Sequence, residues 1–222
     1  MKKVIYLNKK LNIQPYDYLI CILLILFFVG YFGVFSLLSK FLPKIIIYLI
    51  LLITWIITTK NQIKNGIKSF KKEYFKDALS IVVLILIVSS LLFSFGSKYI
   101  ESDMQLKGSV PLALFSSLIF APIFEELMNR CAIGIVLEKF TNNNIIINVI
   151  TTIIFVFLHL YKMNINIVGL FIYALIYFML GYACGYYYRK TNNIVLSMLI
   201  HFIWNSYMII GIVIRNIIRN GV

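Results

Sequence analysis

The chain has 222 residues, of which 61% are hydrophobic and 13% charged, and this composition excludes an ordinary soluble domain and indicates a polytopic membrane protein. The formal net charge of +13 does not indicate a nucleic-acid partner, because most basic residues stand in short connectors between apolar runs, where Lys and Arg orient the spans and meet lipid headgroups. A single transmembrane domain in the lipid bilayer is therefore expected over residues 1–222.

Seven apolar runs approach the roughly 20 residues that a helix needs to cross a bilayer. They are residues 18–38, 45–58, 79–95, 111–137, 145–161, 165–188 and 194–214. The predicted fold class is therefore all-α, a polytopic bundle of about seven transmembrane helices with room for an eighth.

The connector of residues 60–76 is strongly basic. It carries six lysines and one glutamate, and apolar side chains recur at positions 63, 67, 70 and 74. This spacing predicts an amphipathic helix that lies on anionic lipid, and a substrate-docking patch is the alternative. With a cytoplasmic N-terminus, thirteen basic residues fall on the inner side and seven on the outer side, which favours that orientation. The abundance of Asn, Ile and Lys is typical of an AT-rich genome, so a bacterial plasma membrane is the expected location.

Very few ionisable residues lie deep within the predicted spans. They are two acids, one base and the only two histidines of the chain: Glu125, Glu126, Arg130, His159 and His201. A charge near the bilayer centre costs at least about 2.5–3.5 kcal/mol, so such residues persist where they pair, line a cavity or do chemistry. Their concentration in a few spans points to a functional site inside the membrane.

Helical spacing sorts these residues into roles. Glu126 and Arg130 are four residues apart in the favourable acid-first order, so Arg130 is expected to neutralise and orient Glu126. Glu125 points about 100° away from Glu126 and is free for another task. On the last span, His201 and Asn205 are also four residues apart and present an imidazole and an amide on one face. A modest tilt of the spans would bring Glu125 and both histidines into one cavity.

Pro122 lies three residues ahead of Glu125 in the same span. Because proline has no N–H, it cannot donate to the carbonyl one turn back, and a kink is expected there. A kink would open the backbone to water beside the glutamates.

Three motifs, in this order on separate spans, resemble those of one known family. They are Glu-Glu-x-x-x-Arg at 125–130, Phe-x-x-x-His at 155–159 and His-x-x-x-Asn at 201–205. The segment Gly-Tyr-Ala-Cys-Gly at 181–185, followed by Arg189 and Thr191, is also similar to the core of that family. This is the CPBP family of CAAX proteases and bacteriocin-processing proteins, also called Abi. The resemblance covers residues 111–210 and implies a protease core there, preceded by variable spans in residues 1–110.

The resemblance implies catalytic roles for six residues: Glu125, Glu126, Arg130, His159, His201 and Asn205. The first glutamate and the first histidine would hold and activate water for attack on a peptide carbonyl. The second glutamate, with its arginine, would support the site, and the second histidine with Asn205 would stabilise the oxyanion. A divalent metal such as zinc on Glu125, His159 and His201 stays open beside a metal-free, glutamate-dependent mechanism.

The leading hypothesis is an intramembrane endopeptidase that cuts a small peptide precursor or a membrane-associated protein. Other intramembrane proteases fit less well, since the sequence has no His-Glu-x-x-His, Gly-x-Gly-Asp or Gly-x-Ser-Gly motif. The alternative is a non-catalytic bacteriocin-immunity or peptide-binding membrane protein, in which the same residues form a buried polar network. A transporter is a third interpretation, less favoured because no inverted repeat is visible.

Overall fold

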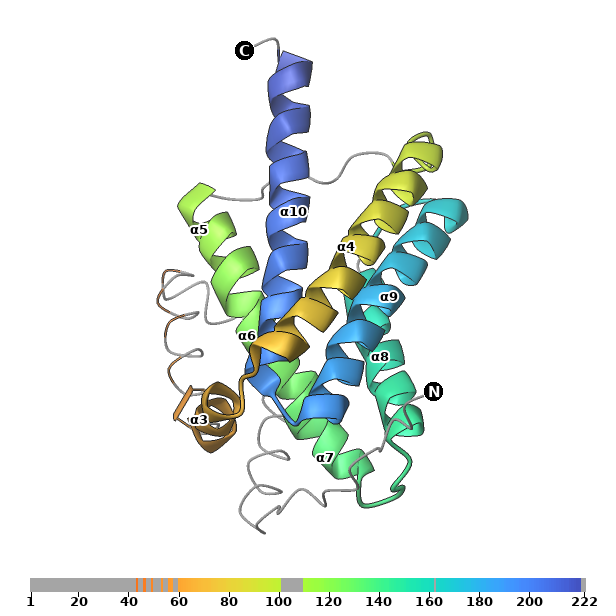
Figure 1. Cartoon of the computed structure of the whole chain (residues 1–222). Coiled ribbons are helices and arrows are strands. Elements are labelled where there is room, and N and C mark those ends of the chain that lie inside the picture. The colour runs from red at the N-terminus through yellow and green to blue at the C-terminus, as the bar shows by residue number, and fades with distance from the viewer. Residues whose placement is uncertain are drawn as a thin grey trace.

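The structure is a computed structural model, and it describes residues 60–100, 110–161 and 163–220 together with a few single positions between 43 and 57. Throughout this part of the chain the regular structure is helical and no strand is present, so the predicted all-α class is confirmed (Figure 1). The elements, with η denoting a π-helix, are α3 (Lys60–Lys68), α4 (Lys72–Phe95), α5 (Val110–Leu114), η1 (Phe115–Phe120), α6 (Ala121–Glu126), η2 (Leu127–Ile133), α7 (Gly134–Leu137), α8 (Asn144–Leu160), α9 (Ile167–Thr191) and α10 (Ile194–Asn220).

Four of the described helical segments are long and apolar enough to cross a membrane. They are α4, the continuous run Val110–Leu137 from α5 to α7, α9, and the part Ile194–Ile214 of α10. α8 is a fifth apolar helix, 17 residues long, at the position of the predicted run 145–161. The predicted count of seven is thus higher than the four long spans shown. The predicted run 18–38 and most of the run 45–58 lie outside the described residues.

Asparagine side chains mark the ends of the helices in the last third of the chain. Asn143 accepts hydrogen bonds from two amides in the first turn of α8, and Asn166 accepts one at the start of α9. α9 ends at Asn192, whose φ of 52° lies in the left-handed region that asparagine tolerates. Asn193 then caps α10 by accepting from the amide three residues ahead at 3.0 Å. These caps fix the register of the spans that carry both histidines.

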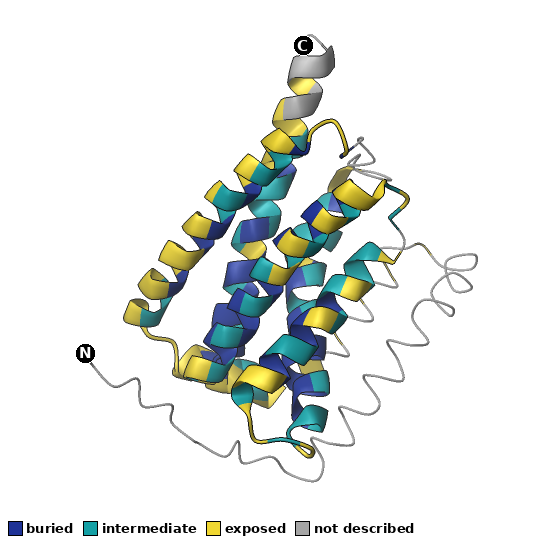
Figure 2. Ribbon diagram, turned by 90° about the vertical axis from the view of Figure 1, so that its right-hand side faces the viewer, coloured by how far each residue is buried: buried dark blue, intermediate teal, exposed yellow. Residues whose placement is uncertain are grey.

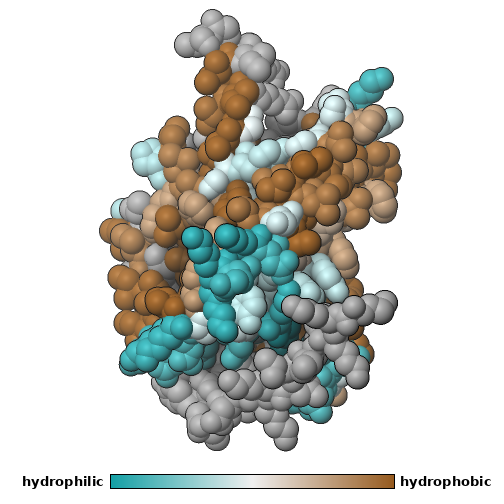
Figure 3. All heavy atoms as spheres, in the orientation of Figure 1, coloured by the Kyte–Doolittle hydropathy of each residue, from teal (hydrophilic) through white to brown (hydrophobic). Residues whose placement is uncertain are grey.

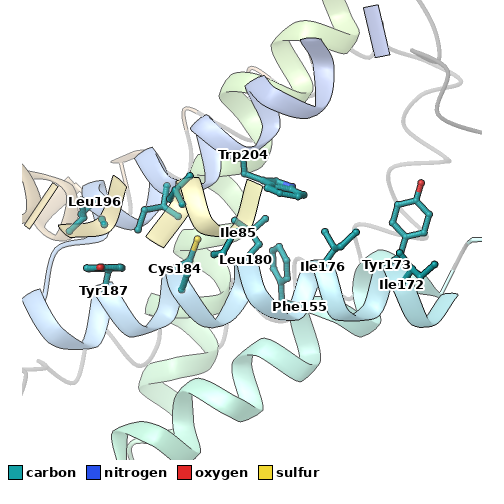
Figure 4. Close-up of a cluster of buried hydrophobic side chains, with 14 of the residues drawn as sticks. Ile85, Phe155, Ile172, Tyr173, Ile176, Leu180, Cys184, Tyr187, Leu196 and Trp204 are labelled. Carbon is teal, nitrogen blue, oxygen red and sulfur yellow. The ribbon is translucent and has the colours of Figure 1, made fainter. Parts of the chain in front are cut away.

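α9 is the central helix, in contact with α4, α8 and α10 (Figure 1). Figure 4 shows how side chains of these four helices meet around it, among them Ile85, Phe155, Leu180 and Trp204. The buried faces of the helices turn toward one another, and the exposed faces turn outward (Figure 2). The outward faces are apolar as well, as at Leu84 of α4, which is 56% exposed. An apolar outer face is what a helix surrounded by lipid requires.

The basic connector is not one helix: α3 ends at Lys68, residues 69–71 are not helical, and α4 begins at Lys72. One side of α3 packs on the protein: Gly66 is buried, and its carbonyl accepts a hydrogen bond of 2.8 Å from the side chain of Asn193. Ile63 packs against the core, whereas Ile67 is 64% exposed. Figure 3 shows hydrophilic surface over this end of the bundle and hydrophobic surface beyond it. The predicted amphipathic helix of the connector is thus present over Lys60–Lys68, shorter than the range 60–76, and its contact with lipid stays a prediction.

Candidate active site

Two π-helical turns flank the glutamates. Glu125 and Glu126 are the last two residues of α6, with η1 before this short helix and η2 after it. In η1 the amide of Ala121 bonds to the carbonyl of Ser116, five residues back instead of four. Such widened turns are rare and are frequent at functional sites. Pro122, where a kink was expected, lies in the first turn of α6 directly after η1, so the local departure from α-helical geometry is a π turn.

The carboxylate of Glu126 is fully buried and holds three donors. Arg130 donates from Nε to Oε2 at 2.9 Å, which confirms the predicted pair. Ser197 of α10 donates to the same oxygen at 2.6 Å. Nδ1 of His201 lies 3.0 Å from Oε1. A buried charge is tolerated when it is paired and its remaining lone pairs are satisfied, and Glu126 meets both conditions.

Arg130 ties three helical segments together. Its side chain is 1% exposed, and beyond Glu126 it donates from Nη1 to the hydroxyl of Thr151 on α8 at 3.1 Å. From Nη2 it donates to the carbonyl of Gly181 on α9 at 2.9 Å. The guanidinium therefore fixes η2 against α8 and α9 through its planar fork.

Two glycines let α9 approach this cluster. A Cβ built on Gly185 would lie 1.7 Å from Oδ1 of Asn148 and 3.0 Å from Nη1 of Arg130. A Cβ on Gly181 would lie 3.1 Å from the ring of Phe155. The segment 181–185 is thus a small-x-x-x-small surface of the kind on which membrane helices pack closely.

Glu125 faces both histidines. Its Oε2 lies 3.4 Å from Nε2 of His159 and 3.8 Å from Nε2 of His201. The side chains of Glu125 and His159 are each 23% exposed, whereas that of His201 is 2% exposed. The structure thus brings together the three residues that were expected to share a cavity, and two of them are open on one side.

Hydrogen bonding assigns the imidazole protons. Nδ1 of His159 lies 2.8 Å from the carbonyl of Phe155, which only accepts, so this nitrogen carries a hydrogen. Nδ1 of His201 faces the Glu126 carboxylate and carries one for the same reason. In the neutral tautomers both Nε2 atoms are then acceptors. They face Oε2 of Glu125, which is buried and forms no hydrogen bond within the part of the chain that the structure describes. Three acceptors therefore converge on a point that needs a proton donor such as water, or a cation.

Zinc is chemically compatible with one carboxylate and two imidazoles. Among the described residues, however, no group of three or more His, Cys, Asp or Glu side chains has the arrangement of a metal site.

Aromatic rings form the apolar wall of the site. The ring centroid of Phe155 lies 4.2 Å from that of His159 and 5.7 Å from that of His201. Tyr177 of α9 lies on His159 with a centroid distance of 4.4 Å. The two residues of the Phe-x-x-x-His motif at 155–159 thus lie ring against ring.

Sequence reasoning missed Ser197, Thr151 and Tyr177. Helical periodicity gives the signal that would have found them, because each lies one or two turns from a residue already singled out. Ser197 precedes His201 by four residues, Thr151 precedes His159 by eight, and Tyr177 precedes the first glycine of the segment 181–185 by four.

Asn205 is directed toward η1. Its Nδ2 donates to the carbonyl of Ser117 at 2.7 Å, one turn of α10 beyond His201. The amide has a second hydrogen, and its side chain is partly exposed.

Comparison with known proteins gives one match. Residues 107–207 match the family described as type II CAAX prenyl endopeptidase Rce1-like, consistent with the resemblance seen in the three motifs. No curated protein and no solved structure matches the chain. The matched segment spans the glutamates, both histidines and Asn205. The match and the apolar helices fit a multi-pass membrane protein.

Proposed function

We propose, from the match of residues 107–207 to the Rce1-like family of CAAX endopeptidases, that this chain is an intramembrane endopeptidase in which Glu125 activates water. The observation that carries the proposal is the buried Oε2 of Glu125, which faces two imidazole nitrogens and forms no hydrogen bond with any residue that the structure describes. The carboxylate of Glu126, by contrast, holds three donors within hydrogen-bond distance.

A water molecule between Glu125 and His159 donates its hydrogens to Oε2 and Nε2. As the water oxygen attacks the carbonyl carbon of the scissile peptide, Glu125 takes one proton. The tetrahedral intermediate then expels the amine, which receives that proton, and an acid and an amine are released. Phe155 and Tyr177, packed on His159, hold the imidazole in place.

The oxyanion is stabilised from α10. His201 donates from Nε2 when both of its nitrogens carry a hydrogen, with Nδ1 held by the Glu126 carboxylate. Asn205 offers the second hydrogen of its amide. Donors that are already oriented toward the developing charge are typically worth about 3–4 kcal/mol in the transition state.

Glu126 and Arg130 act as support. They form no contact with the reacting atoms in this scheme, and they fix His201 relative to Glu125 through the bonds to Nδ1 and to the backbone of α9. If a divalent metal were bound by Glu125 and the two histidines, it would polarise the substrate carbonyl and acidify water.

The substrate that we propose is a small peptide precursor or the end of a membrane-associated protein. An extended peptide has to reach a site within the hydrocarbon region, which favours substrates that already partition into the bilayer. We keep the bacterial plasma membrane and the cytoplasmic N-terminus as part of the proposal, on the distribution of Lys and Arg.

The test uses the full chain reconstituted in lipid nanodiscs with candidate precursor peptides, and mass spectrometry reads new peptide termini. Glu125→Gln keeps the shape of the side chain and removes the base, so cleavage is expected to fall about 100-fold or more. Glu73→Gln, a change at an exposed glutamate of α4, is the matched control and should cleave at the wild-type rate. His159→Ala and His201→Ala complete the set.

Undiminished cleavage in all three site variants would overturn the proposal. The non-catalytic alternative has its own signature: a folded Glu125→Gln variant that cleaves nothing and still protects a bacteriocin-sensitive strain would make binding the function.

A further inference from the structure

The turn before the glutamates leaves one backbone carbonyl without a backbone donor. In a regular α-helix the carbonyl of Ser117 would accept from the amide of Ala121, but that amide bonds to Ser116. In the π register the donor would come from residue 122, five residues ahead, and residue 122 is proline, which has no N–H. Both backbone donors for Ser117 are therefore removed.

The side chain of Asn205 supplies the missing hydrogen-bond donor. Its Nδ2 lies 2.7 Å from the Ser117 carbonyl, and α10 contacts both η1 and α6. A carbonyl inside a membrane span has no bulk water to bond with, so an unsatisfied one is strongly unfavourable. The side chain of Asn205 thus does for Ser117 what the backbone of a regular helix would do.

We propose that Asn205 is a positioning residue, which locks α10 to the span of the glutamates by bonding the carbonyl that Pro122 and the π turn leave free. Pro122 lies three residues before Glu125, and Asn205 lies four residues after His201. The bond therefore joins α10 to η1 about one turn from His201 and about two turns from Glu125, and these two groups face each other at 3.8 Å. Loss of the bond lets the spacing between Glu125 and His201 drift.

This inference rests on the proposed function and adds to it, because it assigns one hydrogen of the Asn205 amide to the fold and leaves the other for substrate. It also distinguishes two explanations for a loss of activity on substitution of Asn205: loss of an oxyanion donor and loss of a contact that positions α10. If Asn205 served the oxyanion alone, the effect of substituting Asn205 would not depend on the residue at position 122.

The experiment measures Asn205→Leu in two backgrounds, wild type and Pro122→Ala, in the full-length protein. Pro122→Ala restores a backbone N–H, so Ser117 regains a donor in either register. Asn205→Leu should lower the unfolding temperature in detergent by about 2–10 °C in the wild-type background and by less than half as much in the Pro122→Ala background. Ser206→Ala, next along α10, is the control, since its hydroxyl bonds to its own helix at Phe202.

Cleavage kinetics give the second measurement. Asn205→Leu should lower kcat with KM unchanged, and Pro122→Ala should restore part of that kcat. An equal fall of the unfolding temperature in both backgrounds overturns the assignment of the bond. An equal loss of kcat in both overturns positioning and leaves Asn205 as an oxyanion donor.

The measurement of the unfolding temperature needs no substrate. If the wild-type protein cleaved nothing, the proposed function would be refuted, but the unfolding temperatures would still test the bond between Asn205 and Ser117. If neither Pro122→Ala nor Pro122→Leu folds, infrared spectroscopy replaces the double variant. The band of an isotope-labelled Ser117 carbonyl, assigned with Ser117→Ala, should move to higher frequency in Asn205→Leu, and an unmoved band overturns the proposal.

Discussion

Substituting Gly185 by alanine tests the close packing of α9 on the buried charges. The added Cβ would lie 1.7 Å from Oδ1 of Asn148, far inside contact distance, and 3.0 Å from Nη1 of Arg130. Asn148 cannot turn away freely, because it is 3% exposed and its Nδ2 donates to the carbonyl of Tyr182 at 3.1 Å. Either that bond breaks or α8 and α9 separate.

The expected cost follows from these two alternatives. Overpacking of a filled interior typically costs about 1–3 kcal/mol. Loss of the hydrogen bond between Asn148 and Tyr182 adds about 0.5–1.5 kcal/mol. A total of about 2–4 kcal/mol corresponds to a fall in unfolding temperature of roughly 5–15 °C for a chain of this size.

Thermal unfolding in detergent, followed by intrinsic fluorescence, measures the effect. Gly211→Ala is the matched control on a neighbouring helix, since no heavy atom lies within 4 Å of the added Cβ. Adding Asn148→Ala to Gly185→Ala removes the clashing oxygen and should recover part of the loss. If Gly185→Ala unfolds at the same temperature as Gly211→Ala, the helices are not as close as described and the reasoning is wrong.

Two further predictions concern the charges of the site. Arg130→Met should destabilise the protein by about 3–5 kcal/mol, because it leaves the Glu126 carboxylate buried without its cation. The unfolding temperature and the expression yield measure this effect. The double variant Arg130→Met with Glu126→Gln should be more stable than Arg130→Met alone, because it removes the unpaired charge. Treatment with a chelator of divalent metals should leave the cleavage rate within about twofold of that of the untreated protein, because the proposed steps need only water and the protein's own groups. A loss of cleavage that added zinc restores, together with about one zinc per chain by elemental analysis, would contradict this prediction.

The spans and the Glu126–Arg130 pair could be predicted from the sequence because both depend on neighbours along one helix. Hydropathy over about 20 residues places a span, and a separation of four residues places two side chains on one face. Such local rules need no knowledge of how helices pack, and the pair at 2.9 Å agrees with them.

Contacts between helices were harder to anticipate. The sequence indicated that Glu125, His159 and His201 could share a cavity, but their close approach depends on how α8 and α10 pack against the span of the glutamates. The two π turns leave no clear signature, since one extra residue per turn is favoured by long-range packing and not by local propensity. Pro122 was the one local signal, and it indicated an irregular backbone without saying which residue would compensate for it.

The position of Arg130 on the same span as Glu126 has a consequence for biogenesis. Residues 110–137 are synthesised before α8, α9 and α10, so this span enters the membrane before Thr151, Gly181, Ser197 and His201 exist. The bond between Glu126 and Arg130 lies within the span and needs none of them, so both charges are already paired at insertion, when an isolated ion is most costly. Glu125 has no such partner on its own helix and meets the imidazoles only when α8 and α10 arrive, so the site is completed last.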